Sequence, residues 1–377
     1  MKRDLAIDYL RSSVTVLVVA HHAALAYNTF SHYDPVHYMK STAPIVDASR
    51  WMLLDSFVGW NDMFFMSLMF LISGLFVTPS IARKGTGNFL SDRMKRLGIP
   101  YLIAITLLSP LAYYPSWLLS NAASKSDFLS SFFTTGVWSG GPAWYIWILL
   151  AFCCFFALAH KLIPNLMEKL SWSATSAHSL VVVFLILSLM TTIPMRLLFL
   201  SNEWTILAGP LVIPAGRILL YFAWFLLGVA LGGAGLENSL SRSNLKPWPI
   251  WLVLGGLTYA AHGLLEVKFA SSAIVPAWLI NIFLASIYSI CCTFTGLAGL
   301  GLARSFFRNA RPVADNLTGN AYGIYIFHYV FVTWIQFYLL TKPLPAALKF
   351  MITFCFALTA SWLLTAMLRK TVANKVL

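Results

Sequence analysis

The sequence predicts an all-α integral membrane protein with about ten transmembrane helices and both termini on the cytoplasmic side. Hydrophobic residues make up 59% of the 377 residues and charged residues only 10%, whereas soluble proteins are nearer ~45–50% apolar and ~25% charged. Apolar runs recur that are long enough to cross the roughly 30 Å hydrocarbon core as helices. Lys and Arg gather in alternate loops. These features exclude a soluble enzyme, a disordered scaffold and a nucleic-acid-binding domain.

Ten apolar runs are the elements that hydropathy predicts. They cover residues 8–28, 51–78, 97–119, 142–160, 178–200, 212–234, 248–266, 274–302, 318–340 and 345–368. The second and eighth runs exceed the length that a span needs, so we expect them to tilt or kink, the second with a break near Gly59. The loops between the runs are too short for a separate soluble domain. Residues 1–377 are therefore predicted to form a single polytopic domain.

The distribution of basic residues predicts the topology. The net charge is +13, from 26 Lys and Arg against 13 Asp and Glu. An even number of helices places both termini on one side, and most basic residues fall in the loops of that side. The positive-inside rule makes that side cytoplasmic. The loop residues His32, Asp34 and His37 are too sparse a set to predict a metal site, and no metal is expected.

The first run carries charged and titratable residues that a membrane helix normally excludes. Each such residue costs several kcal/mol, so it is a candidate functional residue. Arg11 and His22 are eleven positions apart, which returns them to within about 20° of one helical face and separates them by about 16 Å along the axis. Arg11 is thus expected near the cytoplasmic mouth and His22 deep in the bundle. His21 points about 100° away.

Two further arginines precede the third run. Arg93 and Arg96 are three positions apart, with Lys95 beside them, and would share one face of a helix. Converging guanidinium groups suit a phosphate or pyrophosphate. Basic residues before a membrane helix are also ordinary topology anchors. Both interpretations remain open on the charge pattern alone.

The ninth run adds a second titratable group inside the bundle. Tyr322, Tyr325 and His328 follow one another at intervals of three and line part of one helical face. A lone histidine in a helix is more often a packing residue than a catalyst. Two histidines in one bundle, together with tyrosines and arginines, favour a functional site. The aromatic residues Trp144 and Tyr145, by contrast, are typical of an interfacial belt.

These motifs, in this order, resemble those of the membrane-bound acyltransferases called acyltransferase family 3. Arg11 and His22 match its R-x10-H pattern, and Arg93 and Arg96 match its R-x-x-R pattern. The segments MFFMSLMFLISGLF, RLGIPY, PAWYIWILL and AYGIYIFH look like its FF-x-LSG, RL-x-P-Y, H-L-W-F-L and S-Y-x-x-Y-L-x-H motifs. The chain departs from the family pattern at Ile72, Ala143 and Ala321. The compact ten-helix form looks like the glucan-modifying subgroup.

The resemblance implies a multi-pass O-acyltransferase of the bacterial inner membrane. It would transfer an acetyl or succinyl group from cytoplasmic acyl-CoA to a hydroxyl of a glucan or other envelope saccharide, beside other envelope-glucan biosynthesis proteins. Arg11, Arg93 and Arg96 would meet the CoA phosphates. His22 would act as general base or as nucleophile, with Tyr325 and His328 orienting the acceptor or donating to the oxyanion. Neither a metal nor a nucleic acid is implied.

Two other classes of protein remain as alternatives. A secondary transporter of a small anionic or sugar-like solute would suit buried Arg and His and helices interrupted by Gly and Pro. No inverted repeat is visible, however. A non-catalytic partner in an envelope assembly would leave the shared face of Arg11 and His22 unexplained. Hydrolysis of a CoA thioester by the purified protein would separate an enzyme from a transporter.

Overall fold

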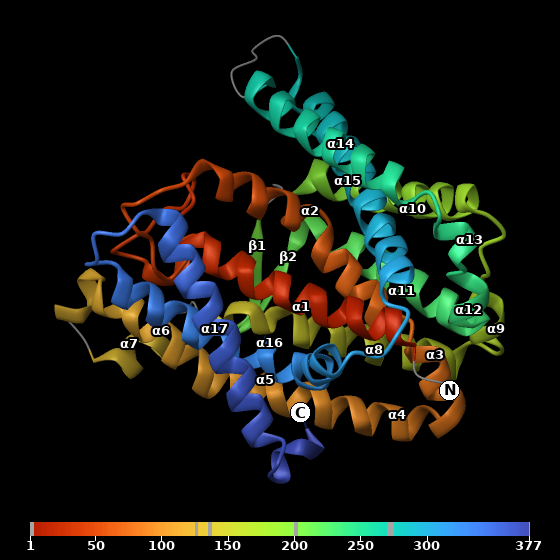
Figure 1. The fold of residues 1–377 in the computed structure, drawn as a ribbon, viewed down its shortest axis with the longest axis horizontal. Helices are drawn as coiled ribbons and strands as arrows, with labels where there is room; N and C mark the ends of the chain where they lie inside the picture. The colour runs from red at the N-terminus through yellow and green to blue at the C-terminus, as the bar shows by residue number, and fades with distance from the viewer. Residues whose placement is uncertain (1–3, 125–126, 135–137, 200–202, 270–274, 377) are drawn as a thin grey trace.

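The computed structural model describes residues 4–124, 127–134, 138–199, 203–269 and 275–376, which are almost entirely helical (Figure 1). Eight helical segments within these ranges are long and apolar enough to cross a membrane. The prediction of an all-α, multi-pass membrane protein is therefore confirmed. Ten long helical segments of the described chain overlap the ten predicted runs. The predicted ends at residues 200 and 274 lie outside the described residues.

The bounds of the elements follow the chain in order. The first half of the chain contains α1 (Leu5–Leu25), η1 (Tyr38–Lys40), α2 (Met52–Gly74), α3 (Val77–Lys84), α4 (Thr86–Arg93), η2 (Met94–Gly98), α5 (Ile99–Ile103), η3 (Ala104–Leu108), α6 (Ser109–Leu118), η4 (Asn121–Ser124), α7 (Phe128–Thr134), η5 (Gly141–Ala143), α8 (Trp144–Leu162) and α9 (Leu166–Leu170). The second half contains α10 (Ala177–Leu198), β1 (Trp204–Ala208), β2 (Leu211–Pro214), η6 (Ala215–Arg217), α11 (Ile218–Ala234), α12 (Leu236–Ser239), α13 (Arg242–Leu245), α14 (Trp248–Phe269), α15 (Ala277–Phe306), α16 (Pro312–Leu339), α17 (Ala346–Leu368) and η7 (Val372–Lys375).

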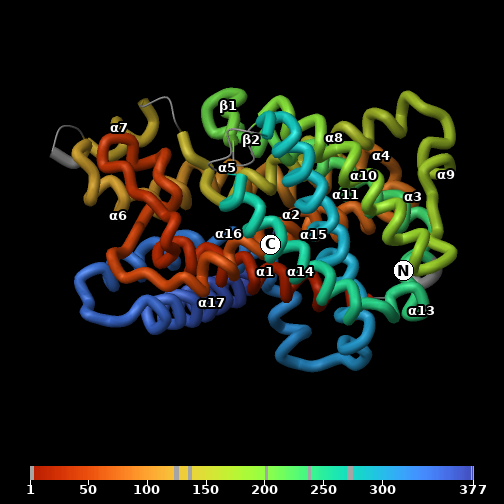
Figure 2. The backbone as a smooth tube through the Cα atoms, turned by 90° about the horizontal axis from the view of Figure 1, so that it is seen from above, coloured from red at the N-terminus to blue at the C-terminus, as the bar shows by residue number. Residues whose placement is uncertain are grey.

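Helix α1 lies at the centre of the bundle. It contacts α2, α15, α16 and α17 (Figures 1 and 2). Of the ten long segments, α1 and α16 are the two that fall outside the eight apolar ones, because both carry polar side chains along their length. In contrast, α14 and the adjoining part of α15 project from the bundle, as Figure 1 shows. The polar side chains of α1 and α16 are thus brought together where these two helices pack.

The start of α1 is held by Asp4. Its carboxylate accepts a hydrogen bond from the backbone N–H of Ile7 at 3.2 Å, which caps the helix. The same carboxylate forms an ion pair with Arg304 of α15 at 2.8 Å, and both side chains are largely buried. Because breaking one partner of a buried pair strands the other charge, this contact fixes α1 against α15 and sets where the residues of α1 face.

Helices α2 and α11 approach each other closely through glycines. A Cβ atom on Gly228 would lie 2.1 Å from the carbonyl oxygen of Leu71, and one on Gly232 would lie 2.1 Å from that of Leu75. These two glycines are four positions apart in α11, the small-xxx-small spacing that permits close packing of membrane helices. A Cβ atom on Gly74 of α2 would lie 2.2 Å from the carbonyl oxygen of Phe225. These contacts are with backbone atoms, which cannot move aside as a flexible side chain can, so a side chain at these glycines would clash.

Replacing Gly228 by alanine is therefore expected to lower the stability of the folded protein by about 1–3 kcal/mol, the usual range for overpacking a tight interface. Thermal unfolding of the detergent-solubilised protein measures this as a lower melting temperature. Gly263→Ala is the matched control, because nothing lies within 4 Å of the added methyl group. If both variants melted at the wild-type temperature, the contact between α2 and α11 would be looser than described.

The prediction that the second run breaks near Gly59 is wrong. Helix α2 continues without interruption through this residue to Gly74. Gly59 instead provides space for a neighbouring helix, since a Cβ atom there would lie 2.6 Å from the hydroxyl oxygen of Tyr259. A break would also have left backbone groups without hydrogen bonds in an apolar environment. The helical run ends only at Leu75 and Phe76, about four turns after Gly59.

The sixth predicted run also begins too early. Residues 212–214 belong to an antiparallel hairpin of β1 and β2, and α11 starts only at Ile218. Gly209 takes φ +51 in the turn between the strands, a conformation that suits glycine. The indole N–H of Trp147 donates to the carbonyl of Val212 at 3.1 Å, which ties the hairpin to α8. A two-stranded hairpin of apolar residues looks like the start of a membrane helix in a hydropathy profile.

Candidate active site

His22 of α1 meets His328 of α16 in the centre of the bundle. The two residues are 306 positions apart, yet Nε2 of His328 lies 3.2 Å from Nδ1 of His22. His328 is completely enclosed, with 0% of its surface exposed, while the His22 ring is partly exposed. Buried Gln336 of the same helix donates to the carbonyl of His22 at 3.2 Å, which satisfies one of the free carbonyls in the last turn of α1. Helix α16 thus holds both the ring and the backbone of His22.

The hydrogen bonds assign the protons of this pair. Nδ1 of His328 lies 2.7 Å from the carbonyl oxygen of Tyr325, and a carbonyl can only accept, so this nitrogen carries the proton. Nε2 of the neutral His328 is then an acceptor. Nδ1 of His22 lies 2.9 Å from the carbonyl of Val18 and faces that acceptor as well, so it is the donor of the contact.

The free nitrogen of His22 follows from this assignment. With its proton on Nδ1, His22 has a lone pair at Nε2, which makes no hydrogen bond to any described residue. A histidine whose one nitrogen is oriented by a second group and whose other nitrogen is free has the geometry of a general base or a nucleophile. His328 acts on His22 rather than facing an open space itself.

A row of tyrosines connects the histidine pair to the end of the bundle where α1 begins. The rings of Tyr325 and His328 are 5.9 Å apart, and those of Tyr145 and Tyr325 are 5.6 Å apart. The hydroxyl of Tyr322 donates to the carbonyl of Arg96 at 2.5 Å. Arg11 and Arg93 both lie close enough to Tyr145 to act electrostatically on its hydroxyl. The row therefore runs from the basic residues to the histidines.

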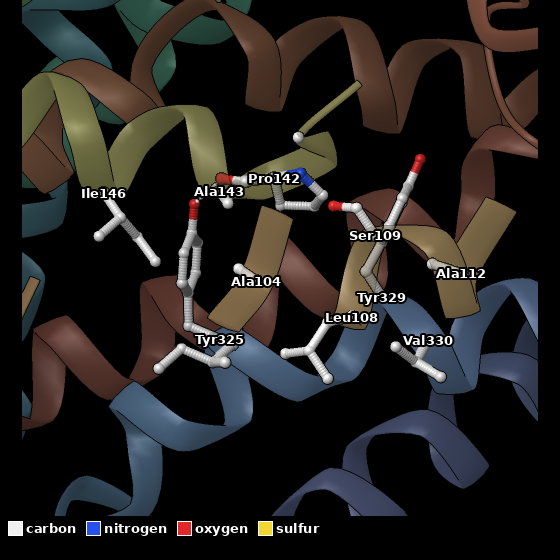
Figure 3. Close-up of a pocket in the computed structure, with 12 residues that line it drawn as sticks. Ala104, Leu108, Ser109, Ala112, Pro142, Ala143, Ile146, Tyr325, Tyr329 and Val330 are labelled. Atoms are coloured by element: carbon white, nitrogen blue, oxygen red, sulfur yellow. Dashed lines mark hydrogen bonds between the residues drawn. The ribbon is translucent and has the colours of Figure 1, made fainter. Parts of the chain in front are cut away.

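Tyr325 and Tyr329 also line a small cavity, drawn in Figure 3. The two side chains rise from α16, and the hydroxyl of Tyr325 points to η5, where it donates to the carbonyl of Pro142. The cavity has a volume of about 20 Å³, room for about one water molecule. The ring of Tyr329 packs against that of His22 at 5.2 Å. In this conformation Tyr325 holds η5 beside the histidine pair.

Arg93 and Arg96 line one pocket, between α3 and the segment formed by α4 and η2. Its volume is about 610 Å³, within the range of small-molecule sites. Arg83 adds a third guanidinium group to the lining, and Lys84 is paired with Asp92 at the rim. The segment is helical, but Arg96 falls in a π-helical turn, which changes the angular spacing from Arg93. The pocket brings the two arginines together in spite of that change.

Arg11 lies apart from the lining of this pocket. Its guanidinium pairs with Asp8 at 3.6 Å, and 44% of its side chain is exposed. Because α1 is an unbroken helix between Arg11 and His22, the predicted separation of about 16 Å along its axis holds. In both Figures 1 and 2, α3 lies near the marked N-terminal end of the chain. The arginines of α1 and of the pocket therefore belong to the same end of the bundle.

The loop at 29–50 shows no metal-binding arrangement. The backbone N–H groups of His37 and Val36 donate to the carboxylate of Asp34 and hold its pKa below the usual value. His37 lies 3.2 Å from the same carboxylate. Among the described residues, no three His, Cys, Asp or Glu side chains are grouped so that they could hold a metal ion.

Sequence reasoning named the two histidines and three arginines as candidates but passed over several of their neighbours. Tyr145 was interpreted as part of an aromatic belt, yet its hydroxyl bonds Ser73 of α2 at 2.8 Å and faces the site. Nothing in the sequence separates Arg83 from the other basic residues of the cytoplasmic loops. In the structure it lines the same pocket as Arg93 and Arg96. Hydropathy does not distinguish Tyr145 from other aromatic residues. Its position in the segment PAWYIWILL, two residues after Ala143, is the signal that could have identified it as a site residue.

The chain belongs to the membrane-bound acyltransferases of acyltransferase family 3. The family's sequence profile, described as an acyltransferase domain, matches residues 4–366. This range contains both histidines, the tyrosine row and the arginine pocket. The chain is therefore a polytopic membrane acyltransferase.

The chain is also similar to glucans biosynthesis protein C of Escherichia coli (strain SMS-3-5 / SECEC). The two are 25% identical over 233 residues, which is 60% of this chain and 57% of that relative. The match thus spans little more than half the length of the relative. No solved structure matches the chain.

Proposed function

We propose that this acyltransferase transfers an acyl group from cytoplasmic acyl-CoA to a hydroxyl group of a glucan or other envelope saccharide, in the bacterial inner membrane. The observation that carries the proposal is the hydrogen-bonded pair of His22 and His328, with one nitrogen of His22 free. The family supplies the reaction class. The relative's name, which refers to glucans, supports a saccharide as acceptor.

The donor would bind at the arginine end of the bundle. Arg93 and Arg96 line a pocket large enough for a phosphate-bearing group, and guanidinium groups hold phosphate oxygens in forked pairs of hydrogen bonds. The pantetheine arm of CoA would extend past Tyr145 and Tyr325 and bring its thioester to His22. This direction agrees with entry of a soluble anionic donor from the side rich in basic loops.

The chemistry would take place at Nε2 of His22. This nitrogen removes the proton of the acceptor hydroxyl as its oxygen attacks the thioester carbonyl carbon. The C–S bond then breaks, and the imidazolium returns the proton to the departing thiolate. His328 accepts the hydrogen bond from Nδ1 of His22 throughout and stabilises the imidazolium that forms. In the alternative mechanism His22 is the nucleophile. Its Nε2 attacks the thioester carbonyl carbon, the thiolate leaves, and the acyl group then passes from His22 to the acceptor hydroxyl.

Mass spectrometry of glucans and surface saccharides tests the proposal. Cells that express the wild-type protein are compared with cells that express His22→Ala protein and with cells that lack both. A mass increment that appears only with the wild type supports acyl transfer and names the group, because acetyl and succinyl differ in mass. Uptake of a small solute without any acylated product would instead favour a transporter.

His328→Ala should lower kcat by about 10- to 100-fold, the usual effect of losing the partner that orients a functional imidazole. KM for the donor should change little, since the hydrogen bonds of His328 within the described residues go to His22 and to backbone carbonyls of its own helix. Steady-state kinetics of the purified protein measure both constants. Thr333→Ala is the matched control, because Thr333 is a buried polar residue of the same helix that bonds only Val330. Equal losses in both variants would point to disturbed packing of α16.

A further inference from the structure

A second polar cluster lies beside the face of α1 that His21 occupies, about 100° around the helix from His22. His21 is the residue through which it adjoins the reaction centre, since the rings of His21 and His22 are 5.5 Å apart. The His21 ring stacks on Phe65 of α2 at 5.0 Å, and only 8% of the residue is exposed. Asp62 and Arg217 both act electrostatically on it. Its buried Nδ1 has no hydrogen-bond partner in the described part of the chain, so the cluster contains an unsatisfied polar atom.

The carboxylate of this cluster is already neutralised. Arg217 of η6 pairs with Asp62 of α2 at 2.7 Å, and the hydroxyl of Tyr288 donates to the backbone carbonyl of Asp62 at 3.4 Å. The side chain of Asp62 is nevertheless 39% exposed, although it lies well inside a long apolar helix. The packing of the bundle therefore does not fully cover the cluster, and the carboxylate of Asp62 keeps part of its surface accessible.

Arg196 of α10 is a second cation of the cluster. Unlike Arg217, it is not paired with a carboxylate of the described residues. Its guanidinium lies over the ring of Tyr288 at 5.8 Å, the same ring that Arg217 approaches at 5.6 Å. Glu266 of α14 is within electrostatic range, but its carboxylate faces Nδ1 of His262, at 3.5 Å. Arg196 makes no ion pair with any residue that the structure describes. A half-buried guanidinium in a membrane bundle is costly unless an anion completes it.

The charges select the kind of anion. Asp62 and Glu266 contribute two negative charges beside the two arginines, so a doubly charged phosphate would meet repulsion. A carboxylate carries one charge and matches the planar fork of a single guanidinium. We propose that Arg196, positioned over Tyr288, binds a carboxylate group that one of the two substrates carries. The inference rests on the proposed function and deepens it, because it makes the enzyme selective for an acidic substrate.

Two sources of that carboxylate are distinguished by kinetics. In the first arm, acetyl-CoA and succinyl-CoA are compared as donors with a neutral oligosaccharide acceptor. In the second arm, acetyl-CoA is used with a neutral and with a uronate-containing oligosaccharide. Arg196→Gln should lower kcat/KM by about 10- to 100-fold for the substrate that carries the carboxylate. Acetyl transfer to the neutral acceptor should stay within about threefold, since no carboxylate is then involved.

Two further variants separate binding from damage to the fold. Arg196→Lys keeps the charge but loses the fork, so its loss should be intermediate. Lys268→Gln removes a positive charge from the exposed last turn of α14, at the same end of the bundle, and should change neither arm. Size-exclusion profiles in detergent establish that each variant is folded.

A binding measurement keeps the inference testable without catalysis. Monomethyl succinate, which carries one carboxylate, should raise the melting temperature of wild-type protein in a concentration-dependent way. Its neutral dimethyl ester should not, and neither compound should stabilise Arg196→Gln. If no donor supported acyl transfer but this pattern appeared, the proposed function would fail and the carboxylate site would stand. If transfer occurred but neither the kinetics nor the melting curves showed a carboxylate-selective effect of Arg196→Gln, the site would be refuted and the function would stand.

Discussion

Replacing His22 by alanine is expected to reduce kcat for acyl transfer by about 10²–10⁴-fold, the range that a positioned general base contributes. The side chain supplies the only nitrogen of the histidine pair that is free to take a proton, because both nitrogens of His328 and Nδ1 of His22 are engaged. His328 is not expected to substitute for it, because His328 is completely buried and its Nδ1 proton is held by the carbonyl of Tyr325. The measurement is initial-rate transfer by the purified protein at saturating donor.

The controls for this variant separate chemistry from folding. His22→Gln keeps a polar side chain of similar length but provides no base, so it should be as inactive as His22→Ala. His178→Ala removes an exposed histidine from the first turn of α10 and should retain full activity. A folded His22→Ala protein with wild-type turnover would remove His22 from the mechanism and leave the histidine pair a structural contact.

The double replacement Arg93→Gln plus Arg96→Gln should raise KM for acyl-CoA by about 10²-fold or more, since each charged hydrogen bond contributes about 1.5–3 kcal/mol. The effect should fall on donor binding and leave kcat within a few-fold, because the pocket lies at the opposite end of the tyrosine row from His22. Raising the salt concentration should weaken donor binding by the wild type more than by the variant, since screening acts on charge pairs.

Lys95→Gln is the matched control for the arginine pocket. It removes the same charge from the same turn, but Lys95 is exposed and is not among the residues that line the pocket. Dephospho-CoA esters, which lack the 3′-phosphate, extend the test when Arg93→Gln and Arg96→Gln are assayed as single variants. The variant that has lost the partner of this phosphate should lose less affinity for the dephospho ester than for the full CoA ester. Equal KM values for the double variant, Lys95→Gln and the wild type would show that these arginines serve topology alone.

The membrane spans could be predicted from the sequence with little error. Hydropathy over about 20 residues is a local property, and a helix in an apolar medium must satisfy its own backbone hydrogen bonds. The exceptions have local causes that hydropathy does not contain. The residue Gly59 provides room for Tyr259 rather than a break, and the strand Leu211–Pro214 is apolar without being helical.

The candidate site could be predicted only in part. The helical period placed Arg11 and His22 on one face of α1, and the structure keeps that helix intact. Period and hydropathy say nothing about which helices become neighbours. The 3.2 Å contact between His22 and His328 depends on the packing of α1 against α16, and the tautomers follow only from that contact.

The sequence alone therefore predicts a set of membrane helices and the polar residues that they cannot easily bury. Which partners satisfy those polar residues depends on how the helices pack. It paired Asp62 with Arg217 and left Arg196 over Tyr288, a distinction that no spacing along the chain reveals. A buried charge or imidazole is satisfied through space, by partners on helices that are distant in the sequence.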